Sequence, residues 1–146
     1  WAVSLHEIGV SVAHSEFHKH GAYILAHADM PGFSKRDQAR LALLVLGQHG
    51  KLQKLASMPA GDPNWRLVFC LRLAALLHRS REDQPVSQVS VKESPVGFQL
   101  EVPAVWLDDN PMTAAALTDE ALLWRRIGLK VRVRPMPSEA AVPIEG

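Results

Sequence analysis

The chain has 146 residues, a net charge of +1 and a hydrophobic content of 47%. This composition is typical of a globular chain rather than a disordered one, with enough residues for one domain or two small ones. The near-zero charge gives no sign of a nucleic-acid-binding protein, and no run of about 18 uncharged apolar residues is present to span a membrane. Because its one cysteine, Cys70, lies in an apolar run, we expect a small buried side chain without an internal disulfide.

The first 82 residues are predicted to be helical. Trp1 opens directly in a helical pattern without a preceding cap, which predicts a piece of a longer polypeptide. Ser15 is expected to cap the second helix, and Ser34 with Asp37 forms a capping-box-like start for the third. Asp62 followed by proline predicts the start of the fourth. The predicted helices are residues 1–12, 17–28, 34–46 with an extra turn near 51–57, and 62–79.

The fourth predicted helix has an almost uniformly apolar middle. Between Leu67 and Leu77, Arg72 is the only charged residue. A helix that is apolar nearly all round is typically enclosed by others. We therefore expect this helix to be buried at the centre of a bundle.

A second, smaller unit is predicted after a polar linker at residues 81–85. Alternating apolar residues predict two strands, residues 86–92 and 97–102, with a tight connection between them. Residues 103–111 are expected to be irregular. Thr118 is expected to cap a helix that Gly128 ends. Two further strands are predicted at residues 112–117 and 130–134.

These elements predict an α+β fold: a mostly helical bundle followed by a small α+β domain with a short, mainly antiparallel sheet. The predicted divisions are residues 1–82 for the helical domain, 86–135 for the end domain and 136–146 for a disordered tail.

Histidines concentrate near the start of the chain. His6 is next to Glu7, and His14, His18 and His20 follow within one short segment. Histidine beside a carboxylate can ligate a metal, transfer protons or bind phosphate. Three interpretations stay open: a metal site, a phosphate-binding cluster, and structural histidines within a helical bundle. His49 and His78, near predicted helix ends, are interpreted as structural.

The phosphate-binding interpretation rests on cations spread along helices and loops, since a phosphate chain needs several positive groups along a groove. Arg40 and Lys54 add further positive charge to the same region. The predicted phosphate contacts are His14, His18, Lys19, His20, Arg36 and Lys51.

The adjacent pair His6–Glu7 on an early helix resembles the HD-phosphohydrolase superfamily, whose metal site has histidine, an adjacent His-Asp pair and a distant aspartate. Glu7 is one methylene longer than aspartate, so it displaces a ligand that must be held within about 0.2 Å. The first histidine of that pattern would precede Trp1. These departures argue against a working metal site here.

Three segments together resemble the C-terminal region of the Ppx/GppA family of exopolyphosphatases and guanosine pentaphosphate phosphohydrolases. They are L-H-E-I-G (5–9), H-S-E-F-H-K-H-G-A-Y-I-L (14–25) and M-P-G-F (30–33), and R-L-A-A-L-L-H-R-S (72–80) extends the likeness. Where that last family stretch has aspartates, this chain has Ala75 and His78. The resemblance therefore implies a dismantled HD-type site at His6, Glu7 and Ala75, with no metal.

The resemblance implies an accessory region of a cytoplasmic hydrolase that acts on polyphosphate or guanosine pentaphosphate. Catalytic residues and Mg²⁺ would belong to a preceding actin-like part. This chain would extend a polyphosphate channel and support a homodimer, without hydrolase activity of its own. The alternatives are an independent metal-dependent HD-type phosphohydrolase and a pure dimerisation module.

Overall fold

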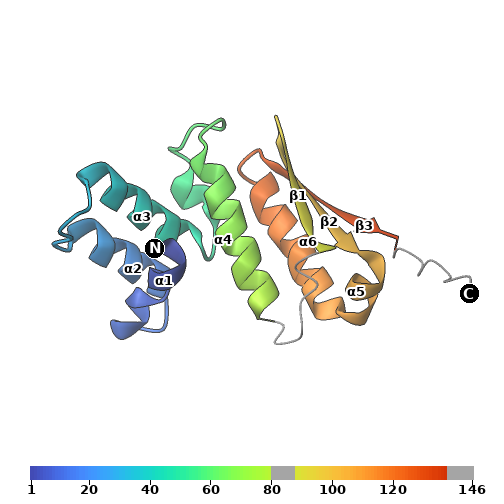
Figure 1. Ribbon diagram of the computed structural model, residues 1–146, viewed down its shortest axis with the longest axis horizontal. Helices are drawn as coiled ribbons and strands as arrows, with labels where there is room; N and C mark the ends of the chain where they lie inside the picture. The colour runs from blue at the N-terminus through green and yellow to red at the C-terminus, as the bar shows by residue number, and fades with distance from the viewer. Residues whose placement is uncertain (80–87, 138–146) are drawn as a thin grey trace, which may run out of the picture. The chain divides into compact units, whose positions relative to one another are not determined.

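The computed structural model describes residues 1–79 and 88–137 (Figure 1). The chain divides into two compact units between Ala75 and Leu76. The first unit is helical, and the second combines a sheet with helices, so the predicted α+β class is confirmed. Within the described ranges, no helix is long and apolar enough to cross a membrane. The predicted linker at 81–85 lies outside the described residues.

The prediction of one continuous helix over residues 1–12 is wrong. The chain instead forms α1 (Ala2–Leu5) and a short 3₁₀ helix, η1 (Ile8–Ser11). Glu7, with φ −103° and ψ 7°, lies between them outside the α-helical region. Gly9 lies so close to the next helix that a Cβ there would be 1.8 Å from the Phe17 carbonyl oxygen. The break therefore lets two backbones approach each other where only glycine fits.

Helices α2 (Phe17–His27) and α3 (Lys35–Gly47) confirm the second and third predicted helices. Glu16, with φ 55°, precedes α2 and gives no side-chain cap, so the predicted cap at Ser15 is wrong. Ser34 does cap α3, since its Oγ accepts a hydrogen bond from the Asp37 backbone N–H at 3.0 Å. The carboxylate of Asp37 in the first turn also suits the helix dipole.

The core of the first unit lies where α1, α2 and α3 pack together. Its fully buried members are Leu25, Leu41, Ala42 and Val45, and partly buried side chains from α1, η1 and the α2–α3 loop surround them. The buried Gln38 side chain donates hydrogen bonds of 2.7 Å to the carbonyls of Leu25 and Ala28. These bonds satisfy carbonyls at the end of α2, which otherwise lack helical partners.

After α3, the 3₁₀ helix η2 (Leu52–Leu55) and α4 (Asn64–His78) complete the predicted helices. Trp65, Val68 and Phe69 of α4 are buried as expected. Leu67 is 38% exposed and Cys70 is exposed, so the predictions of an enclosed helix and a buried cysteine are wrong. Partial burial still raises the pKa of the Cys70 thiol, which keeps it protonated near neutral pH.

The second unit contains a three-stranded mixed sheet in the order β1-β2-β3. Strand β1 (Ser90–Ser94) pairs antiparallel with β2 (Gly97–Pro103), and β3 (Lys130–Met136) pairs parallel with β2. The hairpin and the last strand were predicted, with β1 displaced toward the turn. The parallel pair was not expected in a mainly antiparallel sheet. Met136 closes β3, so the predicted tail begins one residue too early, and residues 138–146 lie outside the described chain.

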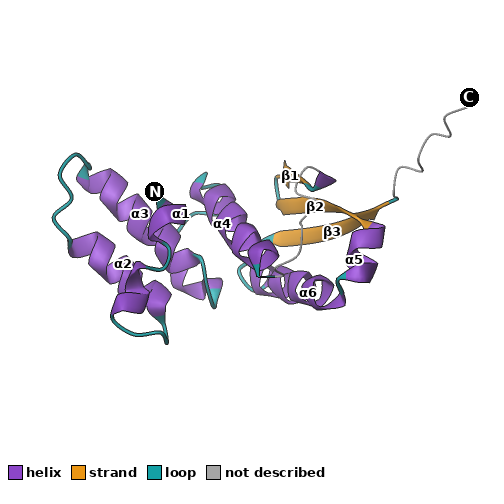
Figure 2. Cartoon of the chain, turned by 60° about the horizontal axis from the view of Figure 1, so that its bottom comes forward, coloured by secondary structure: helices purple, strands orange, loops and turns teal. Residues whose placement is uncertain are grey.

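Two helices connect β2 to β3, namely α5 (Ala104–Asp109) and α6 (Pro111–Arg125). The predicted irregular stretch at 103–111 and the predicted strand at 112–117 are therefore wrong, and Thr118 lies inside α6, where its Oγ1 donates to the Ala114 carbonyl. Figure 2 shows α6 lying along one face of the sheet. Trp124 is fully buried there and packs edge-to-face on Phe98 at 5.6 Å.

Candidate anion-binding site

A buried histidine lies at the start of α2 in the first unit. His18 is only 6% exposed, and its ring lies 5.3 Å from that of His49 in the turn after α3. Its Nδ1 atom is buried and has no hydrogen-bond partner among the described residues. An unsatisfied buried nitrogen is costly, so a ligand or ordered water that bonds to it would stabilise this place.

The second nitrogen of His18 lies beside a lysine at a bare glycine. A Cβ built on Gly50 would lie 3.7 Å from both His18 Nε2 and Lys54 Nζ. Gly50 has a φ of +72°, a conformation that favours glycine. Lys54, on η2, donates from Nζ to the His49 carbonyl. The backbone turn therefore holds an imidazole and an ammonium close together without a side chain between them.

An arginine from α4 completes this group. Arg72 is 5% exposed, and its Nη1 donates to the Gly47 carbonyl at the end of α3 over 2.8 Å. Helix α3 thus receives a cation at its C-terminus, where the dipole favours positive charge. We call His18, His49, Lys54 and Arg72 the cationic cluster.

The cationic cluster resists further protonation. Burial, followed by the nearby charges of Lys54 and His49, lowers the pKa of His18 to about 4. Burial, followed by the charge of Arg72, lowers the pKa of Lys54 to about 8. Burial and like charge disfavour the same protonated forms, and an anion would favour them.

One carboxylate, Glu16, borders the cationic cluster. Its pKa is lowered chiefly by a hydrogen bond from Lys19, and the two side chains form an exposed ion pair. Because Lys19 already pairs with Glu16, this carboxylate compensates Lys19 first and the buried cations less. The arrangement therefore suits an acidic ligand such as a phosphate group.

The predicted phosphate contacts are only partly gathered here. His18 belongs to the cationic cluster, and Lys19 lies at its border with Glu16. His14 and Lys51 are exposed on the surface, and His20 is half-buried on α2. None of these three has a described contact with the buried cations.

Arg36 lies elsewhere, in a hollow of about 580 Å³ at the beginning of α3 and α4. There the neighbouring Arg40 donates from Nε to Asn64 Oδ1 at 2.7 Å. The carboxylate of Asp37 also lines this hollow. Arg36 is therefore separated from the cationic cluster by most of the length of α3, roughly 18 Å at 1.5 Å per residue.

Three members of the cationic cluster were not among the predicted phosphate contacts. Lys54 was noted only as further positive charge in the region, His49 was interpreted as structural, and Arg72 was noted only as the single charge of an apolar helix. The sequence did contain a signal for Arg72. A single arginine in an otherwise apolar, buried segment needs hydrogen-bond acceptors or an anion as partners.

The HD-type positions do not fit a metal. His6 Nδ1 lies 2.6 Å from the Val3 carbonyl, which fixes that nitrogen as a donor, and Nε2 lies 3.7 Å from the Glu7 carboxylate. Ala75, on α4, has no donor atom to offer. Across the described residues, no three histidine, cysteine or acidic side chains gather in a way that could hold a metal ion.

Comparison with known proteins gives a consistent picture. Residues 1–121 match the family model described as Ppx/GppA phosphatase, domain III. A guanosine-5'-triphosphate,3'-diphosphate pyrophosphatase of Pseudoalteromonas translucida is 33% identical over 88% of this chain and 27% of its own length. The protein of the same name from Photobacterium profundum is 34% identical over 82% of the chain and 24% of its own length. The chain thus spans about a quarter of the length of these relatives.

Proposed function

Because the chain belongs to the Ppx/GppA phosphatase family, we propose that it is an accessory part of an exopolyphosphatase or guanosine pentaphosphate phosphohydrolase. The relatives are named guanosine-5'-triphosphate,3'-diphosphate pyrophosphatases, which supports a hydrolase parent. In that parent, Mg²⁺-assisted attack of water would release phosphate at residues outside this chain. Ala75 and the arrangement of His6 support the absence of hydrolysis by this part alone.

The proposed task of this part is to hold phosphate groups distant from the reacting end, through the cationic cluster. The observation that carries the proposal is the juxtaposition of His18 Nε2 and Lys54 Nζ at the bare face of Gly50, with Arg72 behind them. A phosphate there would stabilise the protonated forms of His18 and Lys54, which burial and neighbouring positive charge disfavour. Several weak contacts along one substrate raise its effective concentration at the catalytic residues between cleavages.

A calorimetric titration with inorganic tripolyphosphate tests this proposal. Near pH 8, Lys54 is about half protonated, because its pKa is lowered to about 8. A bound phosphate raises that pKa, so binding takes up a fraction of a proton, roughly half at most. Titrations in two buffers with different ionisation enthalpies measure this uptake directly.

Lys54→Gln is expected to weaken binding about tenfold and to abolish the proton uptake, since charge-assisted contacts are worth about 1.5–3 kcal/mol. Lys35→Gln, an exposed substitution of the same type at the other end of α3, is the matched control and should change neither. Binding with unchanged proton uptake in Lys54→Gln would show that the cationic cluster is not the phosphate site.

We also propose that this part supports a homodimer. Leu67 and Cys70 are exposed on α4, and a second copy that packed against them would bury this small apolar surface. In the full-length protein, Leu67→Glu should shift the sedimentation coefficient toward the monomer. If the variant remained a dimer, α4 would not be part of the dimer interface.

Two assays separate the accessory role from an independent HD-type phosphohydrolase. The isolated chain with Mg²⁺ and polyphosphate should release no phosphate. Elemental analysis should find no stoichiometric Mn, Fe or Zn. Phosphate release or a full equivalent of metal would favour the independent enzyme.

A further inference from the structure

The sheet of the second unit has one face that α6 does not cover within that unit. Phe98, Leu100 and Val102 of β2 point to the α6 side and are buried, so the alternate residues of β2 point the other way. Register places the outward residues of β1 and β3 on the same side. We call this surface the outer sheet face; its residues are Ser90, Lys92, Ser94, Gly97, Gln99, Glu101, Pro103, Lys130, Arg132, Arg134 and Met136.

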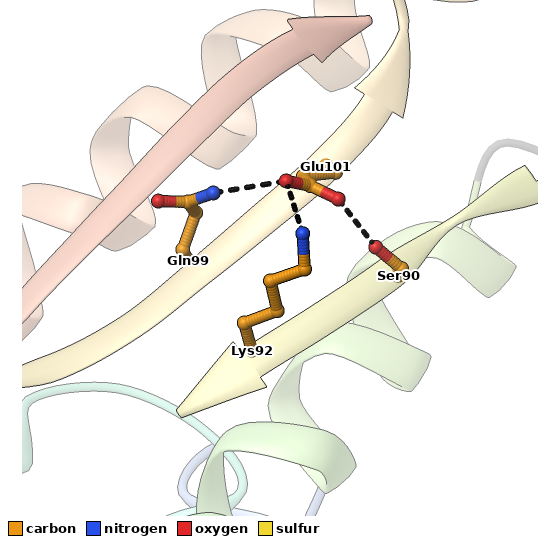
Figure 3. A network of polar contacts seen from close by, with 4 residues as sticks. All are labelled: Ser90, Lys92, Gln99 and Glu101. Atoms are coloured by element: carbon orange, nitrogen blue, oxygen red, sulfur yellow. Dashed lines mark hydrogen bonds and ion pairs between the residues drawn. The ribbon is translucent and has the colours of Figure 1, made fainter. Parts of the chain in front are cut away.

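One half of the outer sheet face is neutralised internally. Figure 3 shows Glu101 at the centre of a network: Lys92 Nζ donates to Oε1 at 2.8 Å, Ser90 Oγ donates to Oε2 at 2.9 Å and Gln99 Nε2 donates to Oε1 at 3.0 Å. These contacts, with Lys92 foremost, lower the pKa of Glu101 to about 2. The carboxylate therefore stays charged and directed to β1 and β2.

The other half carries a row of cations on β3. Lys130, Arg132 and Arg134 are all exposed and alternate with valines that turn toward α6. Opposite them on β2 lie Gly97, Gln99 and Glu101, respectively. No carboxylate of β2 thus faces Lys130 or Arg132, and the one beside Arg134 already accepts three hydrogen bonds, two from β1 and one from Gln99 of its own strand.

The geometry of this row suits a linear chain of phosphates. Alternate residues of a strand lie about 6.6 Å apart, so the three cations extend over about 13 Å in a straight line. None of the outer-face side chains is aromatic, whereas single-stranded nucleic acid is usually held by stacking of its bases on aromatic rings. The surface can recognise charge and guanidinium-bonded oxygens but offers nothing to a base.

We propose that the β3 row of Lys130, Arg132 and Arg134 is a binding surface for linear inorganic polyphosphate, separate from the cationic cluster; the choice of this polyanion rests on the proposed function. The surface binds the phosphate chain along its length and contributes affinity rather than catalysis. Its binding is expected to depend steeply on salt, because each phosphate contact releases counterions.

Fluorescence-polarisation titration of the whole 146-residue chain with labelled inorganic polyphosphate, at several salt concentrations, tests the surface. The double variant Arg132→Gln, Arg134→Gln should bind roughly tenfold more weakly at low salt, and its salt slope should fall by about 2. The control removes two exposed arginines at the C-terminal end of α6 in the same unit, Arg125→Gln with Arg126→Gln, and should bind like the unaltered chain.

The outcomes keep the two proposals apart. Equal affinities for the β3 double variant and the α6 control overturn the β3 surface, whatever Lys54→Gln does. A loss in the β3 variant together with unchanged tripolyphosphate binding in Lys54→Gln supports the β3 surface and counts against the cationic cluster. Labelled oligouridylate that binds as tightly as polyphosphate, and is lost in the same β3 variant, overturns the assignment to polyphosphate.

Discussion

The two units treat charge in opposite ways. In the first, Arg72 and Lys54 donate to backbone carbonyls near His18, and burial lowers the pKa values of His18 and Lys54. In the second, Glu101 accepts hydrogen bonds from β1 and from its own strand, and its pKa falls because the charged form is stabilised. In the first arrangement burial and neighbouring charge disfavour the protonated forms, whereas in the second the partners favour the charged form.

This difference teaches that a charged group must be judged by its partners rather than by its burial. Sequences usually agree with their folds at every level except at functional or strained places. The cationic cluster is such an exception, because burial and like charge there lower the pKa values of two basic groups, His18 and Lys54. The Glu101 network has no such conflict, so it is expected to serve the sheet.

The largest expected losses of stability come from alanine substitutions at one closely packed glycine in each unit. A Cβ on Gly9 would lie 1.8 Å from the Phe17 carbonyl oxygen, and one on Gly97 would lie 2.0 Å from that of Lys130. Neither backbone clash can be relieved by a side-chain rotation, so each alanine variant should lose about 3 kcal/mol or more. Amide hydrogen exchange should show lost protection in the first unit for Gly9→Ala and in the second for Gly97→Ala. Equal losses in both units for both variants would contradict separate effects.

A second pair removes one cation from each unit. Arg72→Met leaves the Gly47 carbonyl without its buried donor and should cost about 1–3 kcal/mol in urea unfolding. It should also raise the pKa of Lys54 toward its ordinary value, because Arg72 is the largest charge that lowers it. Lys92→Met should cost less than about 1 kcal/mol, since Lys92 is 63% exposed and Glu101 retains two other donors. A larger loss of stability in Lys92→Met than in Arg72→Met would contradict this prediction.

The two units should lose stability in different pH ranges. His18 has a folded-state pKa of about 4, below its ordinary value of 6.5, so the unfolded chain binds the extra proton between these values. Stability should therefore fall as pH drops from 6.5 to 4, by roughly 1–2 kcal/mol once solvent screening is allowed for. His18→Asn should flatten that window, with the exposed His27→Asn as control.

The matching carboxylate acts at lower pH. The pKa of Glu101 is about 2 in the folded chain and 4.5 ordinarily, so its stabilising contribution is present above pH 4.5 and lost as pH falls toward 2. Glu101→Gln should remove this acid-dependent loss without altering the window above pH 4.5. If the unaltered chain lost stability near pH 6 and Glu101→Gln did not, the transition near pH 6 would belong to Glu101 in the second unit, which would contradict this prediction.

The smallest expected changes in stability come from substitutions at Ser34 and Thr118, two of the residues that the sequence predicted as helix caps. Ser34→Ala removes a side-chain cap from α3 and should cost about 1 kcal/mol. Thr118→Ala replaces a β-branched residue inside α6 and should stabilise it by up to about 0.5 kcal/mol. Thermal unfolding of both variants tests the opposite signs, and a loss in Thr118→Ala would favour a capping role.

Sequence patterns predicted the parts of the fold that local chemistry decides. Helix α3 begins at Ser34 because a hydroxyl and a carboxylate satisfy its first turn, and both are visible in the sequence. The second half of helix α6 was predicted from Thr118 onward, but its first half was missed although Pro111, favoured at a first helical position, marks its start. The alternation assumed at residues 112–117 was too weak beside an alanine-rich composition that favours helix.

Long-range packing explains what the sequence could not provide. The parallel pairing of β2 with β3 depends on two intervening helices, and nothing within either strand specifies its partner. Arg72 joins the cationic cluster because α4 packs against the end of α3, 25 residues earlier in the chain. The histidine-rich segment indicated a cationic region, but the turn at Gly50 determines which of its members meet.

The parallel strand has a practical consequence for where this protein can be shortened. The family match ends at residue 121, inside α6 and before both Trp124 and β3. A protein ending there would leave β2 with an unpaired backbone edge and Phe98 without its aromatic neighbour. Such a shortened protein is expected to associate through that edge during expression, whereas one that extends through Met136 keeps β2 paired and leaves the charged strand β3 as the edge.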